Sequence, residues 1–298
     1  MRVFVTGATG FVGSAVVQEL IGAGHQVLGL ARSEAGAKAL VAAGAEVHRG
    51  DLANAESLRG GAAMADGVIH TAFIHDFSKF KENCETDRRA IAALADALAG
   101  TDRSLIVTSA TGVLPQGRLS TEETPADSGA AGHLRAASEE AASAVAARGV
   151  RVSVIRLPPS VHGAGDHAFV PLLIRIAREK GVSVFGGDGL NRWPAVHRLD
   201  AARLYRLALE KGTAGAMYHG VAEEGVPFRE IAGVIGRRLD VPVVGKSPED
   251  ATHHFGWFAR FAALDVPTSS ARTRQQLGWQ PAEPGLIADL EGAGYFEG

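Results

Sequence analysis

Three glycines spaced three residues apart follow the first apolar run of the chain and constrain its fold more than any other feature. Residues 3–5 predict a strand, and residues 14–23 predict a helix because their apolar side chains recur at helical spacing. Between them, Gly7 allows a tight turn, Gly10 lets a backbone approach a pyrophosphate, and Gly13 lets the helix pack closely on the strand. This order predicts a dinucleotide-binding turn, with anionic phosphates at the helix N-terminus.

The first half of the chain alternates short apolar runs with helical patterns. Strands are expected at residues 3–5, 26–31, 45–50, 68–72, 105–109 and 152–156, and helices at residues 34–43, 77–99 and around 138–147. Alternation of this kind predicts an α/β fold with a doubly wound parallel sheet, covered by helices on both faces. Ligands in such sheets bind beyond the carboxyl ends of the strands, so functional side chains are expected there.

Composition and charge narrow the class of protein. The chain has 298 residues, of which 46% are apolar and 21% charged, an ordinary globular balance. A formal net charge of -3 gives no electrostatic footprint for nucleic acid or a membrane surface, and no apolar run is long enough to span a bilayer. Cys84 is the only cysteine, and no signal segment follows Met1. We therefore expect a cytoplasmic protein that binds neither nucleic acid nor membranes.

The end of the second predicted strand indicates which dinucleotide is bound. An acidic residue there would bind the ribose hydroxyl of NAD, whereas an arginine accommodates the additional phosphate of NADP. The chain has Arg32 and Ser33 at this point, and we interpret Glu34 as favourable negative charge in the first turn of the next helix. NADP is therefore the predicted cofactor, with a solvated surface arginine as the alternative interpretation of Arg32.

The helix predicted at residues 77–99 carries an acid on its buried face. Its stripe of positions at spacings of three and four comprises Phe80, Cys84, Asp87, Ile91, Leu94 and Leu98. A carboxylate on a packed face must form an ion pair or a hydrogen bond, or must have a raised pKa, because burying a charge without a partner costs free energy. Asp87 is therefore either an acid with a functional role or a structural bridge to a neighbouring loop.

Together these features resemble the short-chain dehydrogenase/reductase superfamily, in its extended or atypical branch of NAD(P)-dependent epimerase/dehydratase-like proteins. The resemblance runs nearly end to end and covers residues 6–13, 50–52, 68–72, 106–111, 156–163, 196–200 and 277–281. It implies a Rossmann domain at residues 1–164, to which residues 195–222 return. A smaller C-terminal region, residues 165–298, would mainly bind the substrate.

The resemblance also implies roles for individual residues. Cofactor-binding residues would be Thr6, Gly7, Thr9, Gly10, Phe11, Val12, Gly13, Arg32 and Ser33, with Asp51 and Leu52 at the adenine, Thr71, Ala72 and Phe73 along the centre, and Pro158, Ser160 and Val161 beside the nicotinamide. Ser109 matches the active-site serine at the end of the fifth strand, with Thr111 as a near substitute. Asp87 matches a helix position that is usually asparagine in the family.

The chain departs from the family in lacking its Tyr-x-x-x-Lys pair. In the family the lysine lowers the pKa of the tyrosine, so that the phenol can exchange a proton with a carbonyl or alcohol during hydride transfer. None of the three tyrosines here has a lysine four residues on. In the equivalent region, residues 131–140, His133 could supply a proton and Arg135 could hold an anionic oxygen. Either side chain could equally be a solvated residue beside a helix start.

The second half of the chain changes character after Gly163. A helix is expected at residues 169–176, a strand at 182–185, a return to the sheet at 196–209 and 216–221, and a helix at 227–239 before a strand-like 241–244. The eleven histidines include no His-x-x-x-His pair or Cys/His cluster, so no metal site is predicted. Residues 254–264 are rich in Phe and Trp, which indicates either core or a subunit contact in a homodimer.

Three function classes remain open. The first is an NADP-dependent oxidoreductase or epimerase on a small carbonyl or alcohol substrate, with Ser109 and Thr111 as hydrogen-bond donors and an unorthodox acid. The second is a redox-silent NADP-binding regulator, which the missing tyrosine favours. The third is a lyase or isomerase that uses the same pocket and Asp87 without net hydride transfer. We rank the first highest because a regulator would have less reason to keep a C-terminal substrate region.

Overall fold

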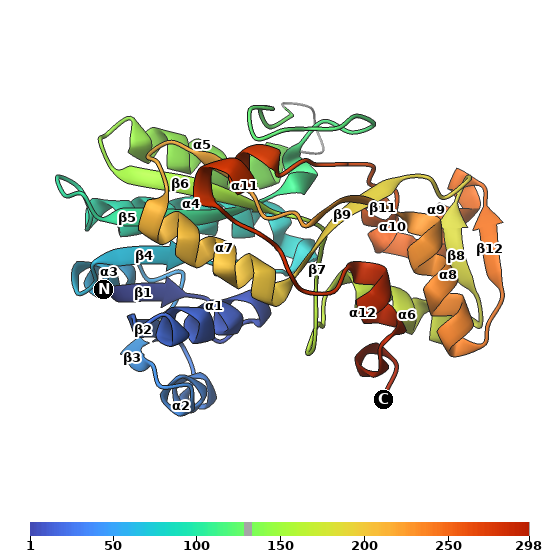
Figure 1. The fold of residues 1–298 in the computed structure, drawn as a ribbon, viewed down its shortest axis with the longest axis horizontal. Coiled ribbons are helices and arrows are strands. Elements are labelled where there is room, and N and C mark those ends of the chain that lie inside the picture. The colour runs from blue at the N-terminus through green and yellow to red at the C-terminus, as the bar shows by residue number, and fades with distance from the viewer. Residues whose placement is uncertain (128–132, 298) are drawn as a thin grey trace.

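A sheet of seven parallel strands organises residues 1–127 and 133–297, the part of the chain that the computed structural model describes; the side chains of His133 and Ala293 lie outside that description. The strand order is β3-β2-β1-β4-β5-β6-β10 (Figure 1). The strands are β1 (Arg2–Thr6), β2 (Gln26–Ala31), β3 (Glu46–Arg49), β4 (Gly67–His70), β5 (Ser104–Ala110), β6 (Arg151–Leu157) and β10 (Met217–His219). The predicted doubly wound α/β sheet is confirmed.

Helices cover both faces of this sheet, so its central strands are fully buried. Val3, Phe4 and Val5 of β1 each have 0% exposure, as expected for a strand with an uninterrupted apolar run. Val3 and Val5 pack in the core under α1 (Phe11–Gly22), α2 (Glu34–Ala42) and α7 (Arg198–Lys211). Phe4 points to the opposite face, toward α3 (Ala55–Ala63), α4 (Phe80–Asp96) and α5 (His133–Ala146).

The helix predicted at residues 77–99 is shorter in the structure. A 3-10 turn, η1 (Phe77–Lys79), precedes α4, which ends at Asp96. Five of the six positions of the predicted stripe are buried, since the exposure of Cys84, Asp87, Ile91, Leu94 and Leu98 is at most 1%. Phe80, at the start of α4, is half-buried, and Leu98 lies just beyond the end of the helix. Asp87 is therefore a carboxylate in the protein interior.

Helix α3 is not predicted by the sequence pattern, because it contains Gly60 and Gly61. Its N-terminus is capped by Asn54, whose side chain accepts a hydrogen bond of 3.1 Å from the Ser57 amide. A Cβ on Gly61 would lie 2.3 Å from the Phe4 ring, so glycine lets the helix approach the sheet. Tertiary packing here overrides a low helix propensity.

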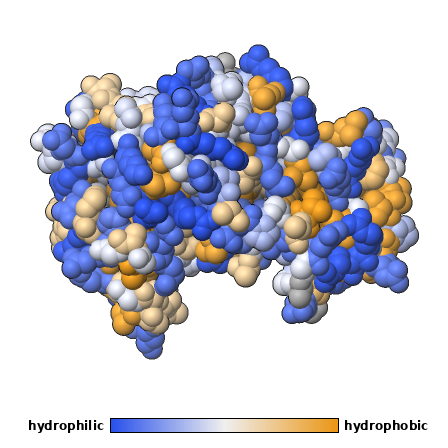
Figure 2. All heavy atoms as spheres, viewed as in Figure 1, coloured by the Kyte–Doolittle hydropathy of each residue, from blue (hydrophilic) through white to orange (hydrophobic). Residues whose placement is uncertain are grey.

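A second lobe follows the main sheet and has its own core. It contains a three-stranded sheet, β11-β9-β7, and a two-stranded parallel sheet, β12-β8. Its elements are β7 (Ser160–His162), α6 (Phe169–Lys180), β8 (Ser183–Gly186), β9 (Arg192–His197), β11 (Glu223–Pro227), α8 (Phe228–Leu239), β12 (Val243–Lys246), α9 (Pro248–Phe255), η3 (Gly256–Phe258), α10 (Ala259–Ala262), α12 (Leu286–Glu291) and η4 (Ala293–Tyr295). Figure 2 shows that apolar side chains gather on the visible face of this lobe.

The chain crosses between the lobes more than once. After β9, helix α7 packs against α1, β10 pairs with β6 at the edge of the main sheet, and α11 (Ala271–Leu277) packs on α7. The predicted division into residues 1–164 and 165–298 stays a prediction. None of the helices in the described residues is both long and apolar enough to cross a membrane.

Candidate active site

The glycine turn between β1 and α1 depends on two close backbone contacts. Gly7 has a φ of +68°, and a Cβ at this position would lie 2.7 Å from the Ala72 amide nitrogen. A Cβ on Gly13 would lie 2.0 Å from the Gly7 carbonyl oxygen. A side chain at either position would therefore force the turn, the helix and the end of β4 apart.

Gly10 differs from its two neighbours in the motif, because it borders open space. A Cβ there would meet a single atom within 4 Å, the Gly7 carbonyl oxygen at 3.2 Å. Gly10 is also the N-cap of α1 and provides no side-chain cap, and the first helical turn contains no acidic residue. The amides of Phe11 and Val12 are thus at a helix N-terminus that a pyrophosphate fits. The turn has the cradle that a dinucleotide needs.

Threonines from two strands hold this turn in place. Thr71 Oγ1 donates a 2.7 Å hydrogen bond to the Thr6 carbonyl oxygen, and the Ala72 amide donates to Thr6 Oγ1 at 3.4 Å. Thr9 is exposed at the tip of the turn. The predicted cofactor residues of β1 and of the segment after β4 therefore lie together.

The end of β2 presents one free cation and one neutralised acid. Ser33 caps α2 by accepting a 3.1 Å hydrogen bond from the Gly36 amide. Arg49 of β3 donates to the Ser33 carbonyl oxygen at 3.0 Å and forms an ion pair with Glu34. Arg32 is exposed and forms no ion pair with any described residue. Arg32 is therefore an exposed cation at the end of β2 that no described acid pairs with.

The remaining predicted cofactor residues lie at the carboxyl ends of β3 and β6. Asp51 is half-buried, and its Oδ1 accepts a 2.8 Å hydrogen bond from the Ala53 amide, while Leu52 packs at the edge of the core under α3. Pro158 and Ser160 are buried, and Val161 is half-buried, where the chain passes from β6 into β7. The Ser160 hydroxyl is buried without a hydrogen-bond partner in the described structure. Cofactor contacts by these residues stay predictions.

Asp87 is the centre of a buried polar network beside the end of β4. His70 Nε2 lies 3.0 Å from Asp87 Oδ1, and His70 Nδ1 lies 2.7 Å from Thr6 Oγ1. Asp87 Oδ2 accepts a hydrogen bond from Ser138 and lies 3.3 Å from Arg135 Nη1. Burial alone would raise the pKa of the Asp87 carboxyl, but the contacts with His70 and Arg135 lower it overall. Asp87 is therefore a fixed negative charge that bridges three elements.

Arg135 is the cation that this network orients. Beyond Asp87, its Nη2 donates a 2.9 Å hydrogen bond to the Thr108 carbonyl oxygen, and its guanidinium lies 4.2 Å from the centroid of the Phe73 ring. The Arg135 side chain is 14% exposed, and its guanidinium lies at the carboxyl ends of β4 and β5, against the Thr108 carbonyl and the Phe73 ring. A guanidinium stays protonated and can hold a polar or anionic oxygen at this point.

Ser109 is hydrogen-bonded to an acid of α5. Its hydroxyl is buried and donates a 2.7 Å hydrogen bond to Glu139 Oε1, and Glu139 in turn pairs with Arg156 at 2.7 Å. Thr111 is also buried, and its hydroxyl has no partner in the described structure. The predicted roles of Ser109 and Thr111 as donors to substrate stay predictions, and for Ser109 they would require it to leave Glu139.

All three tyrosines are engaged elsewhere. Tyr205 OH lies 2.6 Å from Thr108 Oγ1, Tyr218 OH accepts from the Thr213 amide at 2.9 Å, and Tyr295 OH accepts from the Gly163 amide at 3.0 Å. Burial raises the pKa of Tyr205 and of Tyr295 above the ordinary phenol value. Tyr205, which is fully buried, bonds the residue whose carbonyl oxygen holds Arg135. The side chain of His133 and residues 128–132 lie outside the described structure, so the predicted role of His133 stays a prediction.

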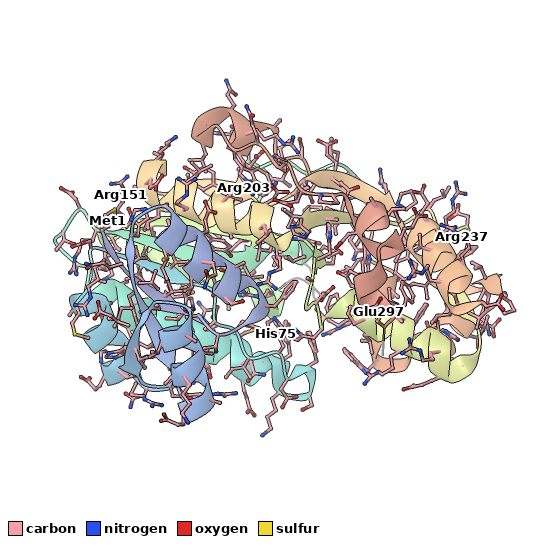
Figure 3. All side chains as sticks on the ribbon, turned by 60° about the horizontal axis from the view of Figure 1, so that its bottom comes forward. Met1, His75, Arg151, Arg203, Arg237 and Glu297 are labelled. Carbon is pink, nitrogen blue, oxygen red and sulfur yellow. The ribbon has the colours of Figure 1, made fainter. Side chains whose placement is uncertain are left out.

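His75 is a candidate that the sequence analysis did not single out. It lies between the two lobes, on the segment between β4 and η1 (Figure 3), and its ring is 5.2 Å from Phe73. The ring keeps exposed surface, yet desolvation lowers its pKa, and the positive charges of Arg135 and His167 lower it further. A neutral imidazole beside an arginine can accept a proton near neutral pH.

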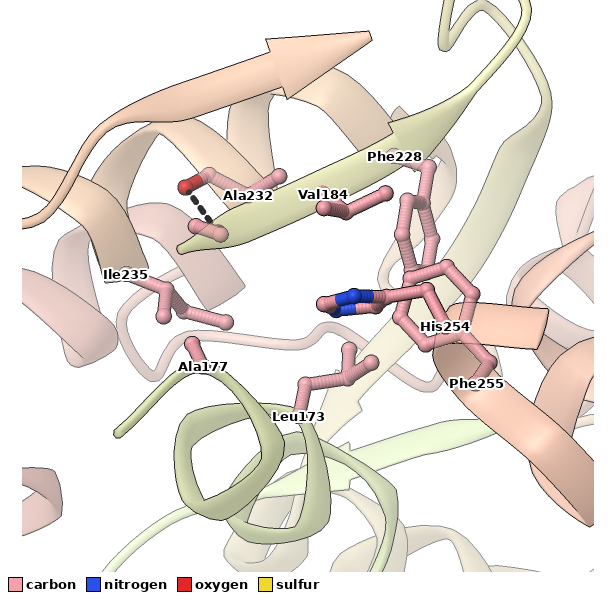
Figure 4. A pocket seen from close by; sticks show the side chains of 9 residues that line it. Leu173, Ala177, Val184, Phe228, Ala232, Ile235, His254 and Phe255 are labelled. Carbon is pink, nitrogen blue, oxygen red and sulfur yellow. Dashed lines mark hydrogen bonds between the residues drawn. The ribbon is translucent and has the colours of Figure 1, made fainter. Parts of the chain in front are cut away.

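A separate cavity in the C-terminal lobe does not belong to this site. It has a volume of about 10 Å³, room for about one water molecule, and lies among apolar side chains of α6, β8 and α8 (Figure 4). The His254 ring points into it, and burial lowers the pKa of His254 to about 4. Among the residues that the structure describes, no group of three or more His, Cys, Asp or Glu could hold a metal ion.

Comparison with known proteins agrees with this geometry. The model of the NAD dependent epimerase/dehydratase family matches residues 3–219. An uncharacterized protein of Schizosaccharomyces pombe is 54% identical over 99% of this chain and 100% of its own length. UDP-glucose 4-epimerase of Streptomyces lividans is 27% identical over 96% of this chain and 93% of that protein. The structure of DesIV, a dTDP-glucose 4,6-dehydratase from Streptomyces venezuelae with NAD bound, superimposes with a TM-score of 0.79 at 21% identity, over 98% of this chain and 95% of that chain.

Proposed function

This chain belongs to the NAD-dependent epimerase/dehydratase family, and from that premise we propose that it is an NADP-dependent oxidoreductase or epimerase for a small carbonyl or alcohol substrate. One observation carries the proposal. Arg135, held by Asp87 and the Thr108 carbonyl where β4 and β5 end, keeps 14% of its side chain exposed, and it lies over the same Phe73 ring that His75 contacts. In this fold the carboxyl ends of the strands are where a dinucleotide and its substrate meet.

NADP is the proposed cofactor because of the charges at the end of β2. Arg32 is free for a charge-assisted contact with a ribose phosphate, and Arg49 neutralises the nearby Glu34. The amides at the start of α1 and the open side of Gly10 would bind the pyrophosphate. When bound, a reduced nicotinamide would give a hydride to the substrate carbon of a carbonyl, and an oxidised nicotinamide would accept one from the carbon of an alcohol.

Two side chains of the protein would then have separate roles: one would stabilise charge on the substrate oxygen, and the other would transfer its proton. The Arg135 guanidinium, positioned by Asp87, would hold the substrate oxygen and stabilise negative charge on it. His75 would take the proton from a substrate hydroxyl, or return it to the oxygen in the reverse direction. This division replaces the single phenol that carries out both tasks in the Tyr-x-x-x-Lys arrangement.

A redox-silent NADP-binding regulator is the second candidate. The observation that favours it is the engagement of the hydroxyls of Tyr205, Tyr218 and Tyr295 in hydrogen bonds within the described structure. A lyase or isomerase that uses Asp87 as a base has less support, because both carboxylate oxygens are already bonded and the pKa is lowered. A cytoplasmic location and a homodimer stay part of the proposal.

A substrate screen that follows NADPH absorbance tests the proposal. We expect one or more aldehydes or ketones to consume NADPH in the wild type, and Arg135→Ala to lower kcat roughly a hundredfold, as for loss of an oxyanion donor. Arg118→Ala, at an exposed surface arginine, is the control. Product analysis by chromatography detects epimerisation without net change in NADPH. Tight NADPH binding with no product from any carbonyl or alcohol would favour the regulator.

A further inference from the structure

Aromatic rings line the surface that leads from Arg135 to the C-terminal lobe. The Arg135 guanidinium lies over the Phe73 ring. The ring centroids of Phe73 and Phe80 are 6.0 Å apart, and the Phe80 ring stacks on Phe77 with centroids 5.7 Å apart. Across the boundary between the lobes, Phe77 stacks on Trp257 at 5.4 Å. We call the set the aromatic wall; its members are Phe73, Phe77, Phe80, Phe169, Trp257 and Phe261.

The aromatic wall is accessible, unlike the aromatic core behind it. Trp257 is 58% exposed, and Phe77 is only half-buried. By contrast, Trp193 and Phe258, which contact the wall through Phe169, are both 0% exposed. A cluster that served only to join the lobes would bury its rings, whereas Trp257 leaves more than half of its surface exposed, where a flat ligand can stack.

We propose that the aromatic wall binds an extended aromatic carbonyl compound, whose rings stack along Phe77 and Trp257 while its carbonyl oxygen reaches Arg135. This inference rests on the proposed function, which gives Arg135 the substrate oxygen. The observation that supports it is the unbroken series of neighbouring rings from Phe73 to Trp257, with centroids 5 to 6 Å apart. A ligand with a single short ring would not span that path.

The chemistry of the wall favours this class over a sugar nucleotide. Sugar hydroxyls need hydrogen-bond partners, and the faces of phenylalanine rings supply none. Besides Arg135 over Phe73, a second cation lies on the wall: Arg260 lies over Phe261 and Phe80, at 4.6 and 5.7 Å from their centroids. Its guanidinium extends the flat surface and holds two of the rings in place. The wall therefore offers stacking area rather than a set of polar contacts.

Trp257 provides a readout of binding that needs no turnover. The other two tryptophans, Trp193 and Trp279, are 0% and 1% exposed, so a stacked aryl ketone would quench mainly Trp257. The experiment titrates the full chain with 4-acetylbiphenyl in the presence of NADP⁺, which cannot reduce it. The saturated analogue 4-acetylbicyclohexyl has the same skeleton without flat rings, and UDP-glucose represents the sugar nucleotides.

Substitutions within the wall separate stacking from general packing. Trp257→Leu and Phe77→Leu should each weaken binding of 4-acetylbiphenyl about three- to tenfold, the usual value of one aromatic pair. Trp257→Phe keeps a ring, so calorimetry should give nearly wild-type affinity while the fluorescence change disappears. Phe296→Leu removes a ring elsewhere, one that contacts Arg238 at 5.0 Å, and should leave binding unchanged.

The outcomes separate this inference from the proposed function. Equal affinity for the saturated analogue, or tighter binding of UDP-glucose that depends on Trp257, would overturn the aromatic substrate class and leave the oxidoreductase proposal standing. Wall-dependent binding of 4-acetylbiphenyl without any oxidation of NADPH would support the wall and contradict the oxidoreductase proposal. Ring-dependent binding together with NADPH oxidation supports both.

Discussion

The Nε2 atom of His70 lies 3.0 Å from Oδ1 of Asp87, which joins the end of β4 to the middle of α4 inside the protein. On the other side of the same imidazole, Nδ1 lies 2.7 Å from Thr6 Oγ1. Asp87 also accepts a hydrogen bond from Ser138 and lies 3.3 Å from Arg135 Nη1. This chain of contacts links the strand that opens the glycine turn to the arginine of the candidate active site.

Asp87→Asn should lower the free energy of unfolding by about 2 kcal/mol or more at neutral pH, because His70 and Arg135 lose a buried charged partner. Urea unfolding measures it. Asp96→Asn is the matched control on the same helix, since Asp96 pairs with Arg59 and Arg148 at the surface and should cost about 0.5 kcal/mol or less.

The effect of Asp87→Asn should depend on pH with a definite sign. Burial would raise the pKa of Asp87, but the contacts with His70 and Arg135 lower it, so the charged form stabilises the folded state above the ordinary carboxyl pKa. That stabilisation disappears as the pH falls through the lowered folded-state pKa. The difference between wild type and variant should therefore shrink in acid, and a difference independent of pH would contradict this role.

Arg32→Ala should weaken NADP binding about tenfold to a hundredfold and leave NAD binding nearly unchanged, because one charge-assisted contact to phosphate is lost. Isothermal calorimetry with both dinucleotides tests this. Lys38→Ala, at an exposed cation on α2, is the control for general charge effects. If wild-type protein bound NAD as tightly as NADP, the assignment of Arg32 would be wrong.

Gly10→Val should abolish dinucleotide binding in a protein that still folds, because the side chain would enter the open space beside the start of α1. Circular dichroism and calorimetry together check folding and binding. Gly22→Ala, at the other end of α1, is the matched control, since a Cβ there meets no atom within 4 Å. Retained affinity in folded Gly10→Val would remove the basis for the pyrophosphate site.

His75→Gln should lower kcat for alcohol oxidation roughly a hundredfold if its imidazole takes the substrate proton. Desolvation and the charge of Arg135 lower the pKa of His75, so wild-type activity should rise with pH through a value below the ordinary histidine pKa and then level off. The His75→Gln variant should lose this rise of activity with pH. His253→Gln, at an exposed helix surface, should keep it. If His133→Gln lost the rise of activity with pH instead, His133 would be the residue that takes the substrate proton.

The fold and the glycine turn were predictable because they depend on local sequence. The φ of Gly7 and the contact of Gly13 follow from the spacing of the motif, and the buried stripe of α4 follows from helical periodicity. Asp87 was recognisable as a buried acid for the same reason. Its partners His70 and Arg135 were not, because they come from other elements, 17 and 48 residues away.

The side chains at strand ends were harder to predict than the strands. Ser109 has the expected position, but its direction depends on Glu139 and Arg156, which come from α5 and β6. His75 carries no local signal, since only the packing of both lobes brings Arg135 and His167 close enough to affect its pKa. Sequence patterns locate a site of this kind, and long-range packing decides which side chains face it.

Deuterium transfer tests the central claim most directly. The wild-type protein is incubated with NADPH labelled with deuterium at the transferred position of the nicotinamide and with 4-acetylbiphenyl, and the alcohol product is examined by mass spectrometry. We predict one deuterium on the carbinol carbon per turnover, from one face of the nicotinamide, and no such product with Arg135→Ala. Unlabelled alcohol, or intact ketone in a protein that demonstrably binds both NADPH and 4-acetylbiphenyl, would contradict an oxidoreductase.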